Sequence, residues 1–302
     1  MPGNINHILF CENPLAHNRV EPDFEPEYTA SKQNGFEPLL FNYDEFLRKN
    51  YETAIKKVSK NKSKEKIIYR GWMLTPVQYS TIYEILLNKN YELLNTGKEY
   101  QNCHYLPDSL KYINGYTPVT IYEKTGNISA LIERASIFSD RPVIIKDYVK
   151  SEKHNWDTAC FVKNASNKND LKEKINNFME LRGEYLNEGI VLREYVELNN
   201  VTTHSKSGMP LSEEYRLFFM YNRLLGMYDY WEEGAYTVQK PETASFEEIA
   251  KNIESNYFTM DIAKTKEGKF IIIELGDGQV AGLPKNTDVN EYYRRMNEII
   301  RS

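Results

Sequence analysis

The N-terminal third of the chain alternates between short apolar runs and stretches with a helical period. The apolar runs predict four strands, at 5–10, 37–41, 66–70 and 91–94. Helices are predicted between them at 44–58 and 75–87, and the second begins with Thr75-Pro76, a pair that is typical of a helix start. The acidic, proline-containing segment 11–35 fits neither pattern. The alternation favours a small, mostly parallel α/β sheet covered by helices.

Turn-forming residues gather at 106–118, and we place a domain boundary there, which makes 1–115 an N-terminal domain. Beyond it the pattern predicts more strands than helices. Strands are expected at 119–123, 142–149, 157–162, 189–196, 214–221 and 224–230, with a hairpin over 258–274. Helices are expected at 128–138, 167–182, 245–255 and 288–300, and a polar loop at 199–210. Strand pairs separated by single helices indicate an α+β fold.

Three carboxylates lie near the end of the predicted hairpin. Because its two strands are joined by a short turn, the hairpin is antiparallel, and Asp261 and Glu274 then face each other with Asp277 just beyond. Carboxylates that converge in a buried place repel one another and are costly to desolvate. Mg²⁺ relieves this repulsion and usually takes one or two carboxylates together with substrate phosphates. The segment therefore predicts a Mg²⁺–nucleotide site, and the alternative is a hairpin with solvated acidic turns.

Two lysines are candidates for holding phosphate. Lys146 directly follows the apolar run Val143-Ile144-Ile145, so its ammonium needs an anionic partner, which a nucleotide phosphate would supply. The alternative is a lysine at a strand end that reaches water. Lys150 begins the next polar turn and is the weaker candidate. No Gly-x-x-x-x-Gly-Lys-Ser/Thr motif occurs in the chain, so phosphate must be held by side chains.

The strand predicted at 189–196 ends in Arg193-Glu194-Tyr195-Val196. Exposed backbone just beyond a strand can pair with the edge of an adenine, and Glu194 can accept from the exocyclic amine or hold the segment in place. An ordinary strand end with solvated charges is the alternative.

Two arginines are candidates for binding a phosphate or a substrate. Glu214 and Arg216 share one face of a strand, where the carboxylate suits ribose hydroxyls and the guanidinium suits phosphate or carboxylate. A same-face or cross-strand ion pair is the alternative. Arg70 follows a strand of the first domain, where ligands of open α/β sheets bind. A structural arginine stacked on Trp72 is the alternative that we favour.

Composition and charge narrow the class of protein. A net charge of −5 and a pI of about 5.7 over 302 residues give no electrostatic reason to expect nucleic acid as a partner. Three isolated cysteines without CxxC spacing, and a start that lacks the features of a signal peptide, favour a reducing cytoplasm. No apolar run is long enough to span a membrane. The histidines and cysteines lack zinc-binding spacing, and there is no Gly-x-Ser-x-Gly motif.

The order of the candidate residues resembles that of the ATP-grasp superfamily. A strand lysine at 146, a strand leading into Glu194, a Glu214/Arg216 strand, and Asp261 followed by Glu274 are similar in order and spacing to D-alanine–D-alanine ligase and glutathione synthetase. The resemblance covers roughly 118–302. It implies an α+β ATP-grasp fold with subdomains at 116–197 and 198–302, the second holding the metal, preceded by a small α/β domain at 1–115.

The resemblance implies roles for individual residues. Lys146 and Lys150 would contact nucleotide phosphates, with Lys146 and Arg216 also taking part in catalysis. Segment 193–196 would meet adenine and Glu214 the ribose. The resemblance makes Asp261 and Glu274 the magnesium ligands.

One position departs from the family pattern. The family usually has Glu-x-Asn at the last metal site, whereas this chain has Glu274-Leu275-Gly276. Asp277 or Gln279 is then the candidate for the missing ligand. We assign Asp277 to the metal, and Gln279, together with Arg70, to the substrate. The combined motifs look closest to a poorly characterised bacterial and phage ATP-grasp clade.

The resemblance implies an ATP- and Mg²⁺-dependent ligase that joins a carboxylate, on a small molecule or a peptide, to an amine or thiol through an acylphosphate. One alternative is a phosphotransferase on the same fold. Another is a non-catalytic ATP-binding module in a phage or defence context. We expect a cytoplasmic protein that binds neither nucleic acid nor membrane, and the sequence makes no prediction of its oligomeric state.

Overall fold

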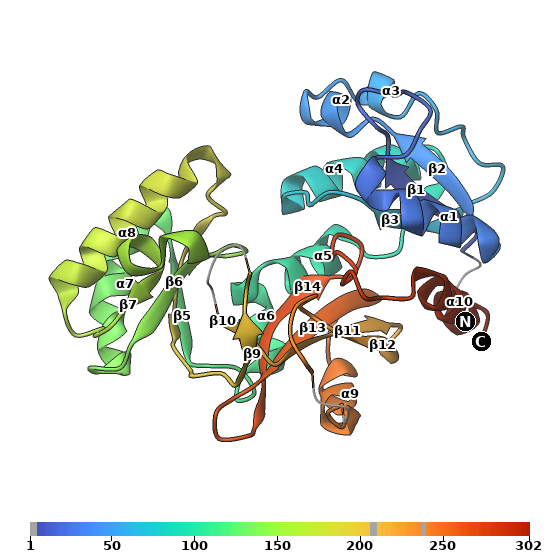
Figure 1. The fold of residues 1–302 in the computed structure, drawn as a ribbon. Helices are drawn as coiled ribbons and strands as arrows, with labels where there is room; N and C mark the ends of the chain where they lie inside the picture. The colour runs from blue at the N-terminus through green and yellow to red at the C-terminus, as the bar shows by residue number, and fades with distance from the viewer. Residues whose placement is uncertain (1–4, 206–209, 237–239) are drawn as a thin grey trace.

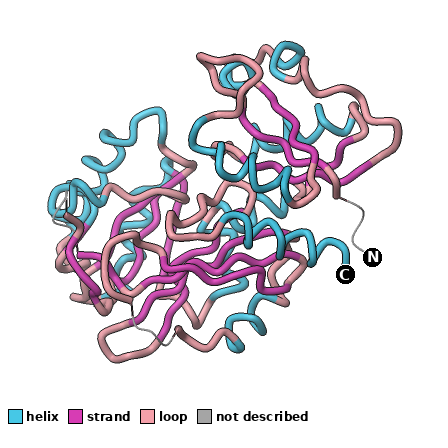
Figure 2. Tube along the Cα trace, turned by 45° about the vertical axis from the view of Figure 1, so that its right-hand side comes forward, coloured by secondary structure: helices cyan, strands magenta, loops and turns pink. Residues whose placement is uncertain are grey.

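The computed structural model describes residues 5–205, 210–236 and 240–302. The described part of the chain forms three four-stranded sheets and a two-stranded ribbon. Figure 1 shows the N-terminal and middle sheets as separate lobes, with the C-terminal sheet joining them. The same arrangement is seen from another side in Figure 2, where the strands of the three sheets are magenta. Each helix within this part of the chain is too short or too polar to cross a membrane.

The N-terminal sheet is parallel, as the alternating pattern predicts. Its strand order is β2-β1-β3-β4. The strands are β1 (His7–Cys11), β2 (Glu37–Phe41), β3 (Glu65–Arg70) and β4 (Tyr91–Leu93), each within two residues of its predicted start and end. Helices α1 (Glu25–Gln33) and α4 (Pro76–Leu87) connect them, and α4 begins as expected, with Thr75 and Gln78 forming a reciprocal capping box. Helix α1 lies in the segment for which the sequence shows no clear pattern.

The single helix predicted at 44–58 is wrong. The structure has two short helices instead, α2 (Tyr43–Leu47) and α3 (Tyr51–Ala54). Lys49, between them, has a φ angle of 65°, which lies in the left-handed region and ends a right-handed helix. The apolar periodicity persists across the break because both helices bury residues against the same sheet, which is why it suggests one helix.

Two further helices, which the pattern does not indicate, follow the N-terminal sheet. They are α5 (Gly97–His104) and α6 (Leu106–Ile113), and both pack against β14 of the C-terminal sheet. Leu106 and Ile113 are buried in the core of that sheet. The boundary at 115 stays a prediction, and these two helices pack with the C-terminal sheet rather than only with the N-terminal one.

The middle sheet is antiparallel, with strand order β5-β8-β6-β7. Its strands are β5 (Thr120–Lys124), β6 (Val143–Asp147), β7 (Phe161–Val162) and β8 (Gly189–Glu194). Helices α7 (Ile128–Arg134) and α8 (Lys168–Arg182) cover one face and enclose its core. Most of the strand predicted at 157–162 is wrong, because Trp156–Cys160 forms a π-helical turn. Short 3-10 turns lie at Pro22–Phe24, Thr125–Asn127, Ala135–Phe138, Lys153–Asn155 and Gly183–Tyr185.

The C-terminal sheet is antiparallel, with strand order β12-β11-β13-β14. Its strands are β11 (Glu214–Met220), β12 (Arg223–Asp229), β13 (Tyr257–Lys264) and β14 (Phe270–Asp277). Helices α6 and α9 (Ala244–Ala250) pack on one face, and α10 (Val289–Arg301) packs at the far end of the other. The polar loop predicted at 199–210 is wrong in part, because β9 (Asn200–Thr203) pairs with β10 (Pro210–Ser212).

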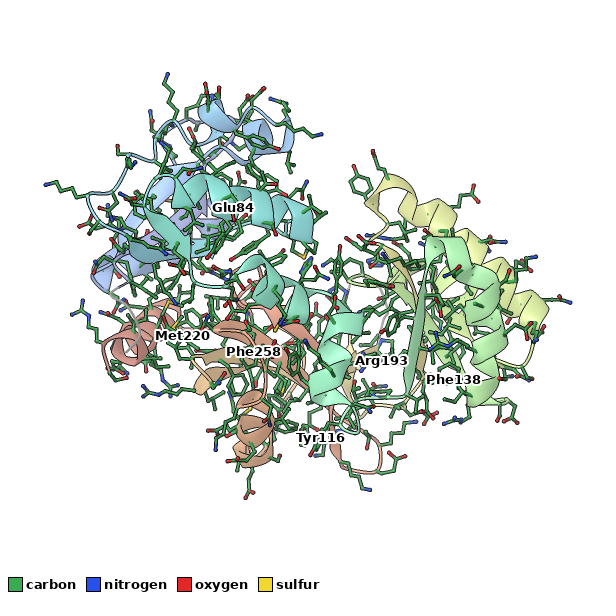
Figure 3. The ribbon with its side chains drawn as sticks, turned by 180° about the vertical axis from the view of Figure 1, so that it is seen from behind. Glu84, Tyr116, Phe138, Arg193, Met220 and Phe258 are labelled. Carbon is green, nitrogen blue, oxygen red and sulfur yellow. The ribbon has the colours of Figure 1, made fainter. Side chains whose placement is uncertain are left out.

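The near end of that second face lies opposite the middle sheet. In Figure 3, Arg193 lies where the middle sheet meets the C-terminal sheet, whereas Phe138 lies among the helices of the middle sheet. The two sheets therefore bring side chains of β6 and β8 to the residues of β13 and β14.

Candidate functional site

Four charged side chains share one face of the C-terminal sheet. The ladder aligns Arg216 of β11 with Asp261 of β13, and Asp261 with Glu274 of β14. Glu214 precedes Arg216 by two residues and so lies on the same face. The predicted hairpin and the pairing of Asp261 with Glu274 are confirmed.

Asp261 is held by Arg216. The Arg216 Nε and Nη2 atoms donate to the two Asp261 oxygens at 2.8 and 2.7 Å, and Nη1 donates to the Gly282 carbonyl at 3.0 Å. Burial raises the pKa of Asp261 above its usual value, although Arg216 opposes the shift. The Tyr230 ring lies 4.8 Å from the guanidinium carbon, which adds a cation–π contact. The ion pair named as the alternative for Arg216 is therefore present.

Glu274 is paired with Lys146, which reaches it from β6 of the middle sheet. The Lys146 Nζ atom donates to Glu274 Oε2 at 2.9 Å. Burial alone raises the pKa of Glu274, but the charge and hydrogen bond of Lys146 outweigh it and bring the pKa down to about 2. The structure thus brings together the strand lysine and the strand carboxylate that the sequence singles out.

Glu214 lies in the least solvated part of the cluster. Burial and the neighbouring charge of Asp261 raise its pKa to about 7. The Ser212 hydroxyl donates to Glu214 Oε2 at 3.1 Å. Lys153 lowers the pKa of Glu214, Asp261 and Glu274, which indicates that its charge acts on the whole cluster. Sequence reasoning places Lys153 only in a polar turn; its proximity depends on how the middle sheet is folded over the hairpin.

Lys150 is also close to the cluster. Burial lowers its pKa, Glu274 opposes that shift, and Lys146 adds to it. The turn that carries Lys150 is held by Asp147, which accepts from the backbone N–H groups of Val149 and Lys150 at 2.7 and 2.5 Å. The turn therefore directs a second lysine toward Glu274.

Arg193 joins the two sheets. It is buried and donates to the Ile273 carbonyl, to the Ile272 carbonyl at 3.1 Å and to Thr117 Oγ1 at 2.6 Å. Burial lowers its pKa to about 10. Its guanidinium is engaged by protein groups at the edge of β14, so Arg193 positions the strand that carries Glu274.

The segment after β8 lies against an aromatic cluster. The Tyr195 ring packs edge-on against Trp156 and Phe161, which are themselves stacked with centroids 5.1 Å apart. Glu194 is paired with Arg141. Within the described residues the backbone N–H of Val196 makes no hydrogen bond. The exposed backbone expected at this strand end is therefore present.

Asp277 lies apart from Asp261 and Glu274. Three residues separate it from Glu274, so the alternation of the strand turns it to the opposite face. There it accepts from Asn95 Nδ2 at 2.6 Å and from the Gln279 backbone N–H at 2.9 Å. Burial raises its pKa to about 7. Asp277 therefore joins strand β14 to the end of β4, and we do not carry it into the metal site.

Arg70 and Gln279 are also committed to internal contacts. Arg70 donates from Nε and Nη2 to Glu27 at 2.8 and 2.7 Å, and from Nη1 to the Gly278 and Ala281 carbonyls at 2.6 and 3.0 Å. Gln279 accepts from the Tyr69 N–H at 3.1 Å and donates to the Tyr79 hydroxyl at 2.7 Å. Arg70 is structural, as we favoured, but it pairs with Glu27 and does not stack on Trp72, whose ring packs on Phe24.

Gly276 has a local explanation. It lies opposite Thr259 on the face that carries Asp261 and Glu274. A Cβ atom at residue 276 would come within 2.6 Å of Thr259 Oγ1. A larger residue, such as the asparagine of the family pattern, requires Thr259 to move.

The donors present fit a magnesium ion that is shared with a nucleotide. Asp261 and Glu274 supply two facing carboxylates, and Mg²⁺ commonly uses one or two carboxylates together with phosphate oxygens. The described residues contain no group of three histidine, cysteine or acidic side chains that would hold a metal without such a partner. The cations that now pair with Asp261 and Glu274 show that negative charge there requires compensation.

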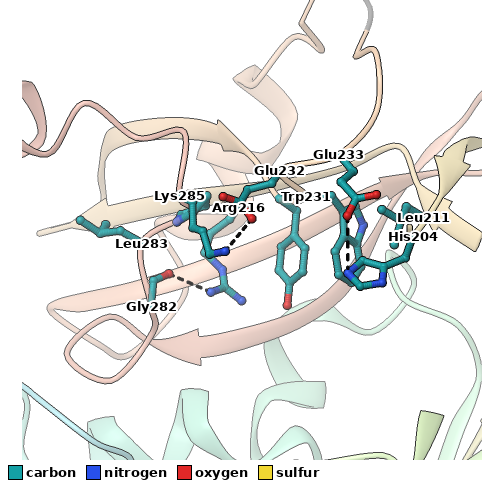
Figure 4. A pocket seen from close by; sticks show the side chains of 11 residues that line it. His204, Leu211, Arg216, Trp231, Glu232, Glu233, Gly282, Leu283 and Lys285 are labelled. Atoms are coloured by element: carbon teal, nitrogen blue, oxygen red, sulfur yellow. Dashed lines mark hydrogen bonds and ion pairs between the residues drawn. The ribbon is translucent and has the colours of Figure 1, made fainter. Parts of the chain in front are cut away.

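A pocket of about 320 Å³ borders Arg216. Figure 4 shows it between the end of β12 and the segment that follows β14. Its lining residues are His204, Leu211, Arg216, Tyr230, Trp231, Glu232, Glu233, Gly282, Leu283, Pro284 and Lys285. Trp231, named from the sequence as a candidate pocket residue, is part of it. Tyr230 is a contributor that sequence reasoning misses, because only the pairing of β11 with β12 brings it beside Arg216.

The geometry agrees with a family match over more than half of the chain. The model of an ATP-grasp domain family, described as family 3 of its clade, matches residues 135–296. The chain belongs to the ATP-grasp superfamily. The match includes Lys146, Glu194, Arg216, Asp261 and Glu274, and it confirms the resemblance drawn from their order.

Solved structures show that this ATP-grasp protein shares its fold along nearly its whole length. A RimK-domain ATP-grasp protein from Sphaerobacter thermophilus is 10% identical, with a TM-score of 0.58, and the match covers 99% of this chain and 100% of that one. N5-carboxyaminoimidazole synthetase from Staphylococcus aureus, complexed with ADP, is 12% identical, with a TM-score of 0.61 and coverage of 98% and 77%. The ATP-grasp ligase PsnB, complexed with a minimal precursor, Mg and ADP, is 12% identical, with a TM-score of 0.55 and coverage of 98% and 97%. No curated protein matches the sequence.

Proposed function

We propose that this ATP-grasp protein is an ATP-dependent ligase that joins a substrate carboxylate to an amine or thiol. The observation that carries the proposal is the pairing of Asp261 and Glu274 on one face of the C-terminal sheet, with Lys146 reaching Glu274 from the middle sheet. Two facing carboxylates with cations around them suit a magnesium nucleotide held between the sheets. The similar structures support this interpretation, since they include a ligase with Mg and ADP bound.

The nucleotide is proposed to bind along the line from Tyr195 to Glu274. Backbone at Glu194 to Val196 pairs with the adenine edge, beside the ring of Tyr195. Glu214 accepts from the ribose hydroxyls, which a carboxylate held near neutrality by burial does well. Lys146 and Lys150 face the phosphates, because both lie close to the charge of Glu274.

Asp261 and Glu274 are the proposed magnesium ligands. Mg²⁺ bound there would neutralise charge on the phosphate oxygens during transfer. Its arrival requires Arg216 and Lys146 to give up part of their present ion pairs. The freed cations can then act on the transferred phosphoryl group.

The proposed reaction has two steps. A substrate carboxylate oxygen attacks the γ-phosphorus of ATP, the bond to the β–γ bridging oxygen breaks, and an acylphosphate and ADP form. The amine nitrogen then attacks the acyl carbon, inorganic phosphate leaves, and the amide forms with loss of the amine proton. Arg216 and Lys146 stabilise the negative charge that spreads over the phosphoryl oxygens. No protein nucleophile is needed, which suits a chain without a catalytic serine or cysteine motif.

A non-catalytic ATP-binding role is the second candidate, and Gly276 favours it. The position where the family pattern has an asparagine lacks a side chain, and Thr259 occupies the adjacent space. The retention of Asp261, Glu274, Lys146 and Arg216 in contact with one another favours catalysis. Release of ADP in the presence of any carboxylate substrate would exclude the non-catalytic role.

Calorimetry of ATP binding, with and without Mg²⁺, tests the proposal on the wild-type chain and on Glu274→Ala. We expect micromolar binding that depends on Mg²⁺ and is lost in the variant, while the circular dichroism spectrum is unchanged. Glu133→Ala, at an exposed position on α7, is the matched control and should bind as wild type. Absence of binding by the wild-type chain under both conditions would overturn the proposed function. Product analysis then separates a ligase, which forms an amide or thioester, from a phosphotransferase, which forms a stable phosphorylated product.

A further inference from the structure

The pocket beside Arg216 is not used by the groups assigned above to nucleotide and metal. Arg216 alone belongs to both, since it holds Asp261 and also lines the pocket. A molecule in the pocket therefore lies next to the residue that is proposed to contact the transferred phosphoryl group. This position is suited to the acid that accepts it.

The guanidinium of Arg216 retains donors for such an acid. An arginine has five N–H groups. One on Nε and one on Nη2 donate to Asp261, and one on Nη1 donates to Gly282. One N–H on each terminal nitrogen is left without a partner among the described residues. Two N–H groups on neighbouring nitrogens match the two oxygens of a carboxylate.

Trp231 presents a second donor. Its indole Nε1 atom is buried and has no hydrogen-bond partner in the described structure. A buried N–H without a partner is destabilising, so an acceptor atom on a bound molecule would improve its environment. Trp231 lies in the pocket lining with Leu211 and Leu283, as Figure 4 shows.

The remaining walls are apolar or internally neutralised. Tyr230, Leu211, Leu283 and Pro284 give aromatic and aliphatic surface. The exposed pair Glu232 and Lys285 is joined by a 2.6 Å salt bridge, so it adds little net charge. A volume of about 320 Å³ is at the small end for ligand pockets. It has room for a small molecule or for one residue of a peptide.

We propose that this pocket selects a carboxylic acid that bears one apolar group, aromatic or branched, and an acceptor atom for the Trp231 indole. A terminal peptide residue or an acylated amino acid has this chemistry. Arg216 orients the carboxylate, and Trp231 and Leu283 determine specificity for the apolar group. The inference rests on the proposed function for its role as the acid substrate, whereas binding to the pocket is independent of ATP.

Binding of three probes tests the pocket. They are N-acetyl-L-phenylalanine, N-acetylglycine, which lacks the apolar group, and N-acetyl-L-phenylalaninamide, which lacks the carboxylate. Binding is followed by calorimetry without nucleotide, and by the fluorescence of Trp231 in a Trp72→Phe/Trp156→Phe variant. We expect the aromatic acid to bind about tenfold or more tightly than either of the others. Equal affinity for all three probes would overturn the inference.

Two variants of Trp231 separate the wall from the indole donor. Trp231→Leu keeps an apolar wall but removes the N–H, and Trp231→Ala removes both, so affinity for N-acetyl-L-phenylalanine should fall in that order. Trp72→Ala, at a half-exposed tryptophan of the N-terminal domain, is the matched control and should bind as wild type. Unchanged affinity in Trp231→Ala would overturn the inference.

The outcomes for the pocket and for the ATP site are distinguishable. Selective binding of the aromatic acid without any ATP binding supports the pocket and contradicts the ligase. Mg²⁺-dependent ATP binding without selection among the three probes contradicts the pocket and leaves the ligase standing.

Discussion

At the residue scale, the site is a set of buried carboxylates whose charges are compensated from different directions. Asp261 is paired with Arg216 within its own sheet, and Glu274 with Lys146 from another sheet. Glu214 has no arginine or lysine within salt-bridge distance among the described residues, and its pKa is raised. The three carboxylates therefore have different protonation behaviour although they share one face.

Lys146→Ala should weaken ATP binding by an order of magnitude or more, because the phosphates lose a buried cation in a poorly solvated site. Calorimetry in the presence of Mg²⁺ measures the change. Lys172→Ala, at an exposed position on α8, is the control and should have no effect. Equal ATP affinity in wild type and Lys146→Ala would rule out the phosphate-binding role.

Glu214 should make stability fall as the pH rises. Its pKa is about 7 in the folded chain against 4.5 for an ordinary glutamate, so the folded state binds more protons than the unfolded state between these values. Stability is then greatest below pH 4.5 for this group and decreases up to pH 7, by an upper bound of roughly 3 kcal/mol, since one pKa unit is about 1.4 kcal/mol. Urea unfolding at pH 5 and pH 8 should show a smaller decrease for Glu214→Gln than for wild type. An identical decrease in both would show that Glu214 does not titrate in this range.

At the scale of elements, the register of the β13–β14 hairpin determines which side chains meet. It aligns Asp261 with Glu274 and Thr259 with Gly276, and it turns Asp277 to the other face. The motif Glu-x-Gly therefore forms a unit with the threonine on the neighbouring strand.

Gly276→Ala should destabilise the fold by roughly 1–3 kcal/mol, because the added methyl group overlaps Thr259 Oγ1. A double-mutant cycle with Thr259→Ala should recover part of this loss, and the free energies of unfolding of the four chains measure the coupling. Purely additive effects would mean that the two residues do not compete for space. Gly126→Ala, where a Cβ meets nothing within 4 Å, is the control for the loss of a glycine.

At the scale of the whole molecule, the N-terminal lobe is joined to the C-terminal sheet by buried polar contacts. Arg70 of β3 binds Glu27 and two carbonyls of the segment that follows β14, and Tyr293 of α10 donates to Glu27 at 2.7 Å. The next residue of that segment, Gly282, accepts from Arg216. The position of Arg216 is thus connected to the N-terminal lobe through a few hydrogen bonds.

Arg70→Ala should destabilise the protein by roughly 3–5 kcal/mol, because it leaves the Glu27 carboxylate buried without its partner. Chemical denaturation measures the loss. Arg48→Ala breaks an exposed pair with Glu45 and should change stability by less than about 1 kcal/mol. A small effect of Arg70→Ala would indicate that Glu27 is readily solvated or protonated.

The sequence by itself determined most of the elements and the central part of the candidate site. Strand alternation and hairpin geometry are local, so the parallel N-terminal sheet, the 258–274 hairpin and the pairing of Asp261 with Glu274 could be predicted. Residue order alone also pointed to the family that the match over 135–296 confirms.

The tertiary structure decided which charged side chains meet, because salt bridges between sheets depend on how distant segments are folded over one another. It paired Lys146 with Glu274 across 128 residues and brought Tyr230 beside Arg216. It also turned Arg70, Gln279 and Asp277 inward, where burial requires partners that only neighbouring elements supply. The backbone breaks at Lys49 and at Trp156–Cys160 were hidden for the same reason, since the apolar pattern continues across them while the chain changes direction.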